Sequence, residues 1–142
     1  MICPYKSSIL NPLDDSGFSR MEVGCGKCGA CKHNRRSSWN FRIIQEAKSS
    51  RSCYFITLTY HDSVLPYTEN FLPTLVKQDV QKFNKRIRKL QSQISEERLR
   101  FFCVGEYGTK FHRPHYHLIY FNLYPELSQP EVLLTIVTGK LK

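Results

Sequence analysis

The chain has 142 residues, 41% of them hydrophobic and 13% aromatic, which allows one compact domain and excludes both a second domain and a disordered composition. Its formal net charge of +9, from 21 Lys and Arg against 12 Asp and Glu, favours a polyanionic partner such as nucleic acid, although a merely soluble basic protein has the same balance. No apolar run is long enough to cross a bilayer and the N-terminus lacks a signal-peptide pattern, so we expect no membrane partner and a reducing cytoplasm.

The N-terminal part of the chain is dominated by turn formers and cysteines. Residues 1–24 show no periodicity that predicts a helix or strand. The next seven residues hold three cysteines at repeated Cys-x2-Cys spacing, namely Cys25, Cys28 and Cys31. In a reducing compartment these are free thiols or metal ligands rather than parts of a disulfide framework. Structural Zn²⁺, with Cys3 or His33 as the fourth ligand, stands beside two alternatives, an iron–sulfur cluster and unligated thiols.

A helix and a strand are predicted next. From about residue 34 to 48, Trp39, Ile43 and Ala47 recur at spacings of four, which predicts a helix. Residues 53–60 give the strongest strand signal because they are dense in β-branched and aromatic types. Alternation then places Tyr54, Ile56, Leu58 and Tyr60 on one face, and Phe55, Thr57 and Thr59 on the other.

The second half of the chain predicts a helix followed by a hairpin. From about residue 74 to 93, apolar residues recur at alternating steps of four and three, which is typical of an amphipathic helix with a solvated basic face. Two strands, at 99–107 and 114–122, flank a loop at 108–113. One strand, a helix and a hairpin together predict an α+β fold with an antiparallel sheet. Two cysteines within the strands, Cys53 and Cys103, are expected to be small core residues.

The hairpin carries the chemically most informative pattern. On a strand, His115 and His117 point to the same face, so both imidazoles can bind one ion. A turn near Lys110 to Phe111 sets Glu106 opposite His115, which completes a site of two histidines and one carboxylate. Such a site holds a divalent cation with open positions for substrate oxygens, where the cation polarises a phosphodiester. The alternative is a pair of ordinary strand histidines.

Three segments, taken as an ordered set, resemble blocks of rolling-circle replication initiators. They are Phe-Ile-Thr-Leu-Thr-Tyr at 55–60, Gly-Glu-Tyr-Gly at 105–108 and Arg-Pro-His-Tyr-His at 113–117. They look most like the replication proteins of gokushoviruses, which are small single-stranded-DNA phages of the microvirus family. The cysteine turn, followed by basic residues and Trp39, is also similar to the start of those proteins, so the resemblance covers most of residues 20–122.

The resemblance implies a nicking domain of the HUH class, built on a central antiparallel sheet with flanking helices and preceded by a cysteine-rich turn. The expected divisions are a cysteine-containing segment at 1–34, the nicking domain at 35–124 and a truncated tail at 125–142. In the family, the histidine pair and a nearby acid bind Mg²⁺ or Mn²⁺. A tyrosine on a following helix attacks the DNA and becomes joined to the 5′ phosphate, and the free 3′ hydroxyl primes replication.

Carried over to this sequence, His115 and His117 match the histidine pair and Glu106 matches the acid. The implied partners are single-stranded DNA at a replication origin and host replication proteins, in the cytoplasm of a bacterial host. The residues expected to contact DNA are Thr57, Thr59, Lys82, Lys85, Arg86, Lys89, Lys110 and Arg113.

The nucleophile is where the match to the family fails. After His117 the chain offers only Tyr120, which alternates to the opposite face, and Tyr124, which precedes Pro125 in an expected turn. Tyr124 is therefore the one catalytic candidate, and we expect the family's tyrosine to be missing, as in a phage remnant or one part of a split protein. A non-catalytic DNA-binding protein is the main alternative function. An iron oxygenase with two histidines and one carboxylate is a further one.

Overall fold

The computed structural model describes residues 1–131 and 133, which fall in two compact units, residues 1–45 and 46 onward. The units divide inside helix α1 (Gly29–Ser49) rather than at residue 34, the boundary expected from the sequence. Most of the expected tail at 125–142 lies outside the described residues. Within them, no helix has the length and apolar character needed to cross a membrane.

The first unit contains an antiparallel hairpin that the sequence did not predict. Strands β1 (Ser7–Leu10) and β2 (Arg20–Val23) pair with Ser7 opposite Val23. Almost every residue of the hairpin is exposed, so neither face imposes the alternation by which strands are recognised. The cysteine turn and α1 follow. The helix was predicted correctly, but no residue of α1 is buried.

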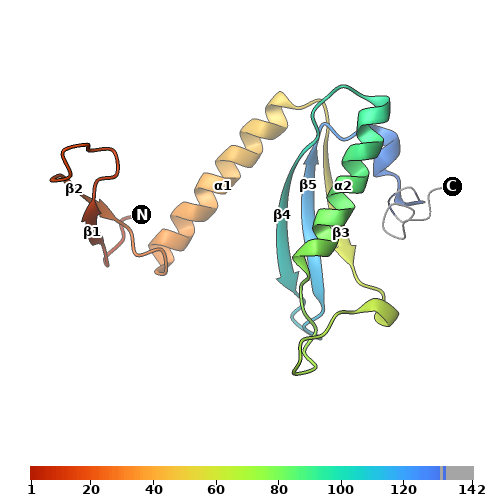
Figure 1. Ribbon diagram of the computed structural model, residues 1–142, viewed down its shortest axis with the longest axis horizontal. Coiled ribbons are helices and arrows are strands. Elements are labelled where there is room, and N and C mark those ends of the chain that lie inside the picture. The colour runs from red at the N-terminus through yellow and green to blue at the C-terminus, as the bar shows by residue number, and fades with distance from the viewer. Residues whose placement is uncertain (132, 134–142) are drawn as a thin grey trace. The chain divides into compact units, whose positions relative to one another are not determined.

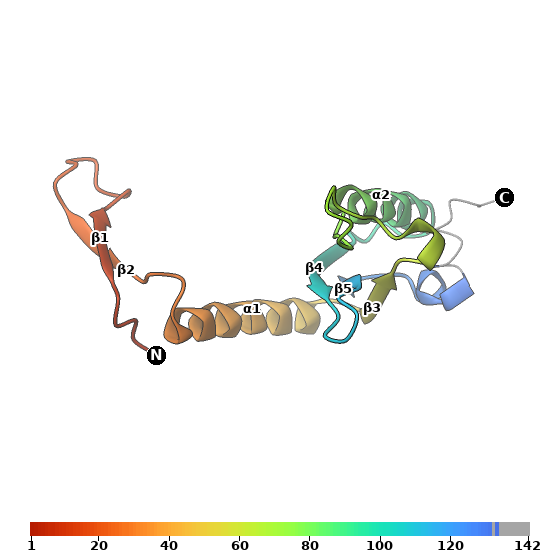
Figure 2. The ribbon, with the colours of Figure 1, turned by 90° about the horizontal axis from the view of Figure 1, so that it is seen from below.

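The second unit contains a three-stranded antiparallel sheet in the order β3 (Cys53–Thr59), β5 (Pro114–Phe121), β4 (Arg100–Tyr107). Helix α2 (Lys77–Ile94) packs on one face of this sheet, as two perpendicular views show (Figures 1 and 2). Short 3-10 helices, η1 (Asp62–Val64) and η2 (Pro125–Ser128), lie in the connections. The predicted α+β fold with an antiparallel sheet is confirmed.

The core of this unit lies between the sheet and α2, because the strands alternate as predicted. Along β5 the residues at alternate positions, including Leu118 and Tyr120, are fully buried. The prediction that Cys53 is a core residue is wrong, because alternation places it on the exposed face of β3. Cys103, by contrast, packs against the core. The core cluster consists of Ile56, Phe83, Ile87, Leu99, Tyr116, Leu118, Tyr120, Leu123 and Leu127.

Two buried polar side chains of α2 are matched by partners from the rest of the unit. Gln91 donates from Nε2 to the carbonyl oxygen of Asn122 at 2.7 Å, and its Oε1 accepts from the backbone N–H of Tyr124 at 3.0 Å. Asn84 accepts a hydrogen bond from the Tyr120 hydroxyl. These bonds fix α2 against the central strand without leaving the buried amides unsatisfied.

Replacing Tyr120 with phenylalanine is expected to lower the free energy of unfolding of this unit by about 1–3 kcal/mol, because the buried amide oxygen of Asn84 loses its donor. Urea unfolding of the two proteins measures the difference. Tyr124→Phe is the matched control, since Tyr124 is exposed, and it should leave stability unchanged. Equal stability of Tyr120→Phe and the wild-type chain would contradict the role of this bond.

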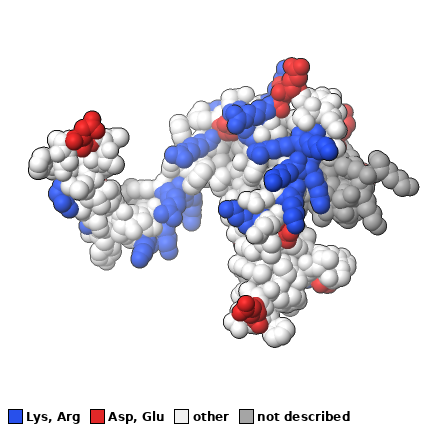
Figure 3. Space-filling model, viewed as in Figure 1, with Lys and Arg blue, Asp and Glu red and all other residues white. Residues whose placement is uncertain are grey.

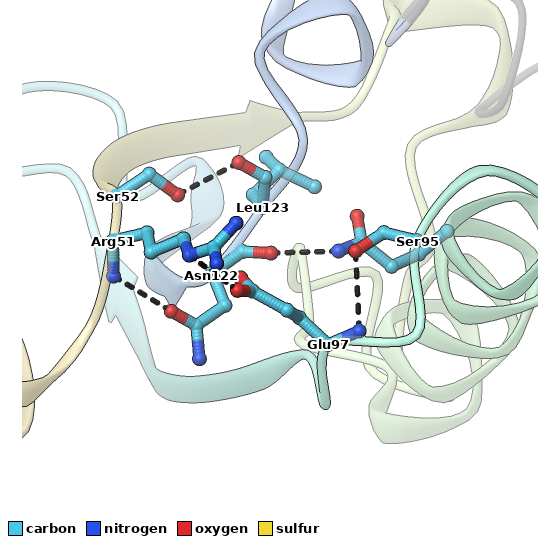
Figure 4. Close-up of polar contacts among 7 residues, drawn as sticks. Arg51, Ser52, Ser95, Glu97, Asn122 and Leu123 are labelled. Carbon is cyan, nitrogen blue, oxygen red and sulfur yellow. Dashed lines mark hydrogen bonds and ion pairs between the residues drawn. The ribbon is translucent and has the colours of Figure 1, made fainter.

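A set of polar contacts closes the end of the sheet where β3 begins and β5 finishes (Figure 4). The backbone N–H of Arg51 donates to Oδ1 of Asn122 at 2.9 Å, and the Ser52 hydroxyl donates to the carbonyl oxygen of Leu123 at 2.7 Å. Asn122 has a φ of 61°, a left-handed conformation that asparagine tolerates better than most residues. The chain can therefore turn sharply after β5 and return over the core.

Candidate metal centre

The register of the sheet brings the predicted ligands together. On the central strand, His115 is paired with Glu106 of β4 and with Thr59 of β3. His117 is paired with Thr57. The predicted pairing of Glu106 with His115 is therefore confirmed. All these side chains project from the face of the sheet that α2 does not cover, because the residues that alternate with them form the core.

The three side chains converge closely enough to share one ion. One possible ligand atom from each of Glu106, His115 and His117 lies within 4.8 Å of the others. Nε2 of His117 is 3.5 Å from Oε2 of Glu106. The two imidazole centroids are 5.0 Å apart, with an interplanar angle of 80°. Two imidazoles and a carboxylate on a partly exposed face suit a divalent cation that keeps open positions.

Neighbouring oxygens orient both imidazoles. Nδ1 of His115 lies 3.1 Å from the carbonyl oxygen of Arg113, to which a protonated Nδ1 donates. Nδ1 of His117 lies 3.1 Å from the hydroxyl oxygen of Thr57. With both Nδ1 atoms engaged as donors, each Nε2 keeps its lone pair for a metal, as is usual for metal-binding histidines. Thr57 therefore acts on the site through His117.

Phe55 is a neighbour of the site that the sequence analysis did not single out. Its ring stacks on His117, with centroids 5.5 Å apart and an interplanar angle of 18°. The side chain is nevertheless 67% exposed, so one face of the ring is open to a ligand. The signal was present in the sequence, since Phe55 lies two residues before Thr57 on the same strand face.

Arg113 was expected to contact DNA, and the structure gives its guanidinium partners within the protein. It donates to the carbonyl oxygen of Tyr60 at 2.5 Å and forms an ion pair with Asp62. The guanidinium holds the pKa of the Asp62 carboxyl below its usual value. Arg113 thus fastens the loop that follows β3 to the start of β5, next to the histidines. Lys110 remains exposed at the tip of the hairpin.

The other expected DNA contacts on α2 lie on the opposite side of the sheet from the histidines. Figure 3 shows Lys and Arg side chains gathered over the face of the unit that α2 forms. The exposed basic residues predicted there are Lys82, Lys85, Arg86 and Lys89. The structure therefore does not bring this basic surface and the metal centre onto one face.

Neither of the tyrosines after His117 reaches the centre. Tyr120 is 0% exposed and faces the core, as its position in the strand predicted. Tyr124 is exposed, but it follows the end of β5. The four residues from His117 to Phe121 alone span roughly 13 Å of strand. The structure therefore does not place Tyr124 among the candidate ligands.

The cysteines form a second cluster, in the first unit. The sulfur atoms of Cys3, Cys25, Cys28 and Cys31 all lie within 4.8 Å of one another, so Cys3 rather than His33 completes the set. Backbone N–H groups of Cys28 and Lys27 lower the pKa of the Cys25 thiol to about 6. These residues are far from the histidines in sequence and belong to a separate unit.

Comparison with known proteins assigns the family. The model of the replication-associated protein family of the ORF2 type matches residues 53–138, which include the three-stranded sheet and the three predicted metal ligands on it. The chain belongs to this family. Members of the replication-associated family occur in phages, and the resemblance to microvirus replication proteins drawn from the sequence is confirmed.

Three curated relatives are similar over most of this chain. Replication-associated protein ORF2 of Spiroplasma virus 4 is 37% identical over 71% of the chain, and replication-associated protein VP4 of Bdellovibrio phage phiMH2K is 34% identical over 72%. Replication-associated protein ORF4 of Chlamydia phage 1 is 27% identical over 86%. The chain spans about a third of the length of these relatives, with 31–32% of each covered. No solved structure matches significantly.

Proposed function

We propose that the chain binds single-stranded DNA and holds Mg²⁺ or Mn²⁺ against one phosphodiester, as the metal-binding part of a protein that nicks and rejoins DNA at a replication origin. The observation that carries this proposal is the convergence of Glu106, His115 and His117 on an exposed sheet face in a chain of a replication-associated family. An oxygenase with the same ligands needs an enclosed substrate pocket, whereas these residues lie on an open face.

The proposed roles of the residues follow from their contacts. A bound divalent ion would polarise the phosphate and orient it for in-line attack. Glu106 and the two Nε2 atoms hold the ion, while Thr57 and the carbonyl of Arg113 keep the imidazoles in the binding orientation. The open face of Phe55 provides a stacking surface for a base next to the phosphate.

A second candidate function is DNA binding without cleavage. The tyrosines of the three strands alternate to the face opposite the histidines, and Tyr124 lies past the end of β5. The described part of the chain therefore holds a phosphate site without a tyrosine hydroxyl beside it. A protein that binds an origin strand in this way would need the same metal ligands but would form no covalent intermediate.

The test uses the full chain with single-stranded oligonucleotides tiled across a microvirus origin. We expect Mn²⁺ to strengthen binding by at least about tenfold in the wild-type chain and to have no effect on a His115→Ala/His117→Ala variant. His112→Ala, in the exposed hairpin loop, is the matched control and should bind as the wild type does. Fluorescence anisotropy at fixed salt measures the affinity, because phosphate contacts depend strongly on salt.

A denaturing gel of the same samples separates the two functions. A covalent DNA adduct that requires Mn²⁺ and disappears in Tyr124→Phe assigns nicking to this chain. Metal-dependent binding without an adduct supports the second function. Binding that is equally strong without metal and in the double-histidine variant contradicts both, because each requires the metal centre.

A further inference from the structure

The four cysteines of the first unit have the spacing of a mononuclear metal site. Sγ of Cys28 is 3.7 Å from Sγ of Cys3, and all four sulfurs lie within 4.8 Å of one another. Four thiolates placed tetrahedrally around one Zn²⁺ at about 2.3 Å lie roughly 3.8 Å apart. An iron–sulfur cluster holds several iron and sulfide atoms between its thiolates and needs a wider cage.

Backbone N–H groups point at the sulfurs in an ordered series. The N–H of Cys25 donates to the sulfur of Cys3 at 3.4 Å, and the N–H of Cys28 donates to that of Cys25 at 3.4 Å. The N–H of Cys31 donates to the sulfur of Cys28 at 3.5 Å. Such donors stabilise thiolate charge and fix the direction of each sulfur, which is what the surroundings of a metal site provide.

The same unit has no apolar core that could hold it together. Among residues 1–45, all of which the structure describes, only the side chain of Cys3 is buried. The large apolar residues of the unit are exposed, and they include Leu10, Leu13, Phe18, Met21 and Trp39. Units of fewer than about 70 residues that lack a sufficient core are usually stabilised by a metal or by disulfides.

The turn is also built closely around the sulfurs. A Cβ at Gly24 would lie 2.8 Å from Sγ of Cys31 and 3.6 Å from Cβ of Cys3. A side chain at this position would therefore displace the cluster. The close approach of the backbone to two of the sulfurs brings the segment before β1 against the first turn of α1.

We propose that Cys3, Cys25, Cys28 and Cys31 bind one structural Zn²⁺. The ion joins the N-terminal segment, the turn after β2 and the start of α1, and it replaces the missing apolar core of residues 1–45. Binding displaces the thiol protons to solvent and changes no oxidation state. This site has no part in the phosphate chemistry proposed for the second unit, and its ligands are thiolates rather than the harder set of Glu106 and the histidines.

The test measures zinc in the purified full chain carrying His115→Ala and His117→Ala, so that the second unit cannot contribute a metal site. We expect about one Zn²⁺ per chain by elemental mass spectrometry, as four thiolates bind one ion. Cys3→Ser and Cys28→Ala should each lose it. Cys53→Ser is the matched control, because Cys53 lies outside the cluster and is exposed, and it should retain the zinc.

Cobalt substitution keeps the proposal testable if these variants fail to fold. The Co²⁺-loaded chain should show the visible absorption of tetrahedral thiolate coordination, and Cys3→His should shift that spectrum while retaining the ion, since three cysteines and one histidine also form zinc sites. Three results would each overturn the proposal: a metal-free chain, zinc retained in Cys3→Ser, or stoichiometric iron with sulfide. A disulfide between Cys3 and Cys28 in the freshly isolated chain would do so as well.

Discussion

Replacing His117 with alanine is expected to lower the affinity of the chain for Mn²⁺ by at least about 100-fold. Substitution of residues that merely orient a metal ligand typically costs about 10–100-fold in affinity, and loss of a ligand costs more. His117 lies at the centre of the site, with Glu106 on one side at 3.5 Å and Thr57 on the other at 3.1 Å. Isothermal titration calorimetry with Mn²⁺ measures the change.

Two further substitutions make this experiment specific. His112→Ala removes a histidine from the exposed hairpin loop and should leave Mn²⁺ affinity unchanged. Thr57→Val removes the hydroxyl beside Nδ1 of His117 and should weaken affinity by about 10-fold, because the imidazole loses its orienting partner. If His117→Ala and His112→Ala bound Mn²⁺ equally well, the metal centre would be refuted.

Leu118→Ala is expected to lower the free energy of unfolding of the second unit by about 2–5 kcal/mol. Leu118 is 0% exposed and lies on the central strand, between Ile56 of β3 and Cys103 of β4. Its loss leaves a cavity that neighbours on three elements cannot fill without moving. Urea unfolding followed by the near-ultraviolet circular dichroism of the core tyrosines reports on this unit.

The control for Leu118→Ala is Val104→Ala, on the exposed face of β4. It removes apolar atoms from a strand of the same sheet without opening a core cavity, so its effect should be about 0.5 kcal/mol or less. A loss as large for Val104→Ala as for Leu118→Ala would show that the core does not lie between the sheet and α2.

The elements that could be predicted from the sequence are those with one buried face. Phe83 and Ile87 are buried on α2, and the alternation of β3 and β5 was correct, because a buried face imposes a period on the residues that form it. The pairing of Glu106 with His115 was predictable for a second reason. A short hairpin loop fixes the register of its two strands, and the register fixes which side chains meet.

What escaped prediction involves contacts that no local period encodes. The hairpin of β1 and β2 buries neither face, so its residues carry no alternation. The choice of Cys3 over His33 in the cysteine cluster depends on a return of the chain over 22 residues, the separation of Cys3 and Cys25. Helix α2 begins at Lys77 rather than near residue 74, since Val76 keeps an extended backbone conformation.

The strand order also sets the sequence of events in folding. Glu106 and His115 face each other across a short hairpin, whereas Thr57 and His117 are separated by 60 residues. Short loops close faster and at lower entropic cost than long ones. The ligands of the metal centre can therefore assemble on the β4–β5 hairpin while β3 has still to dock. An ion captured at that stage would accelerate folding of the sheet more than it would slow unfolding.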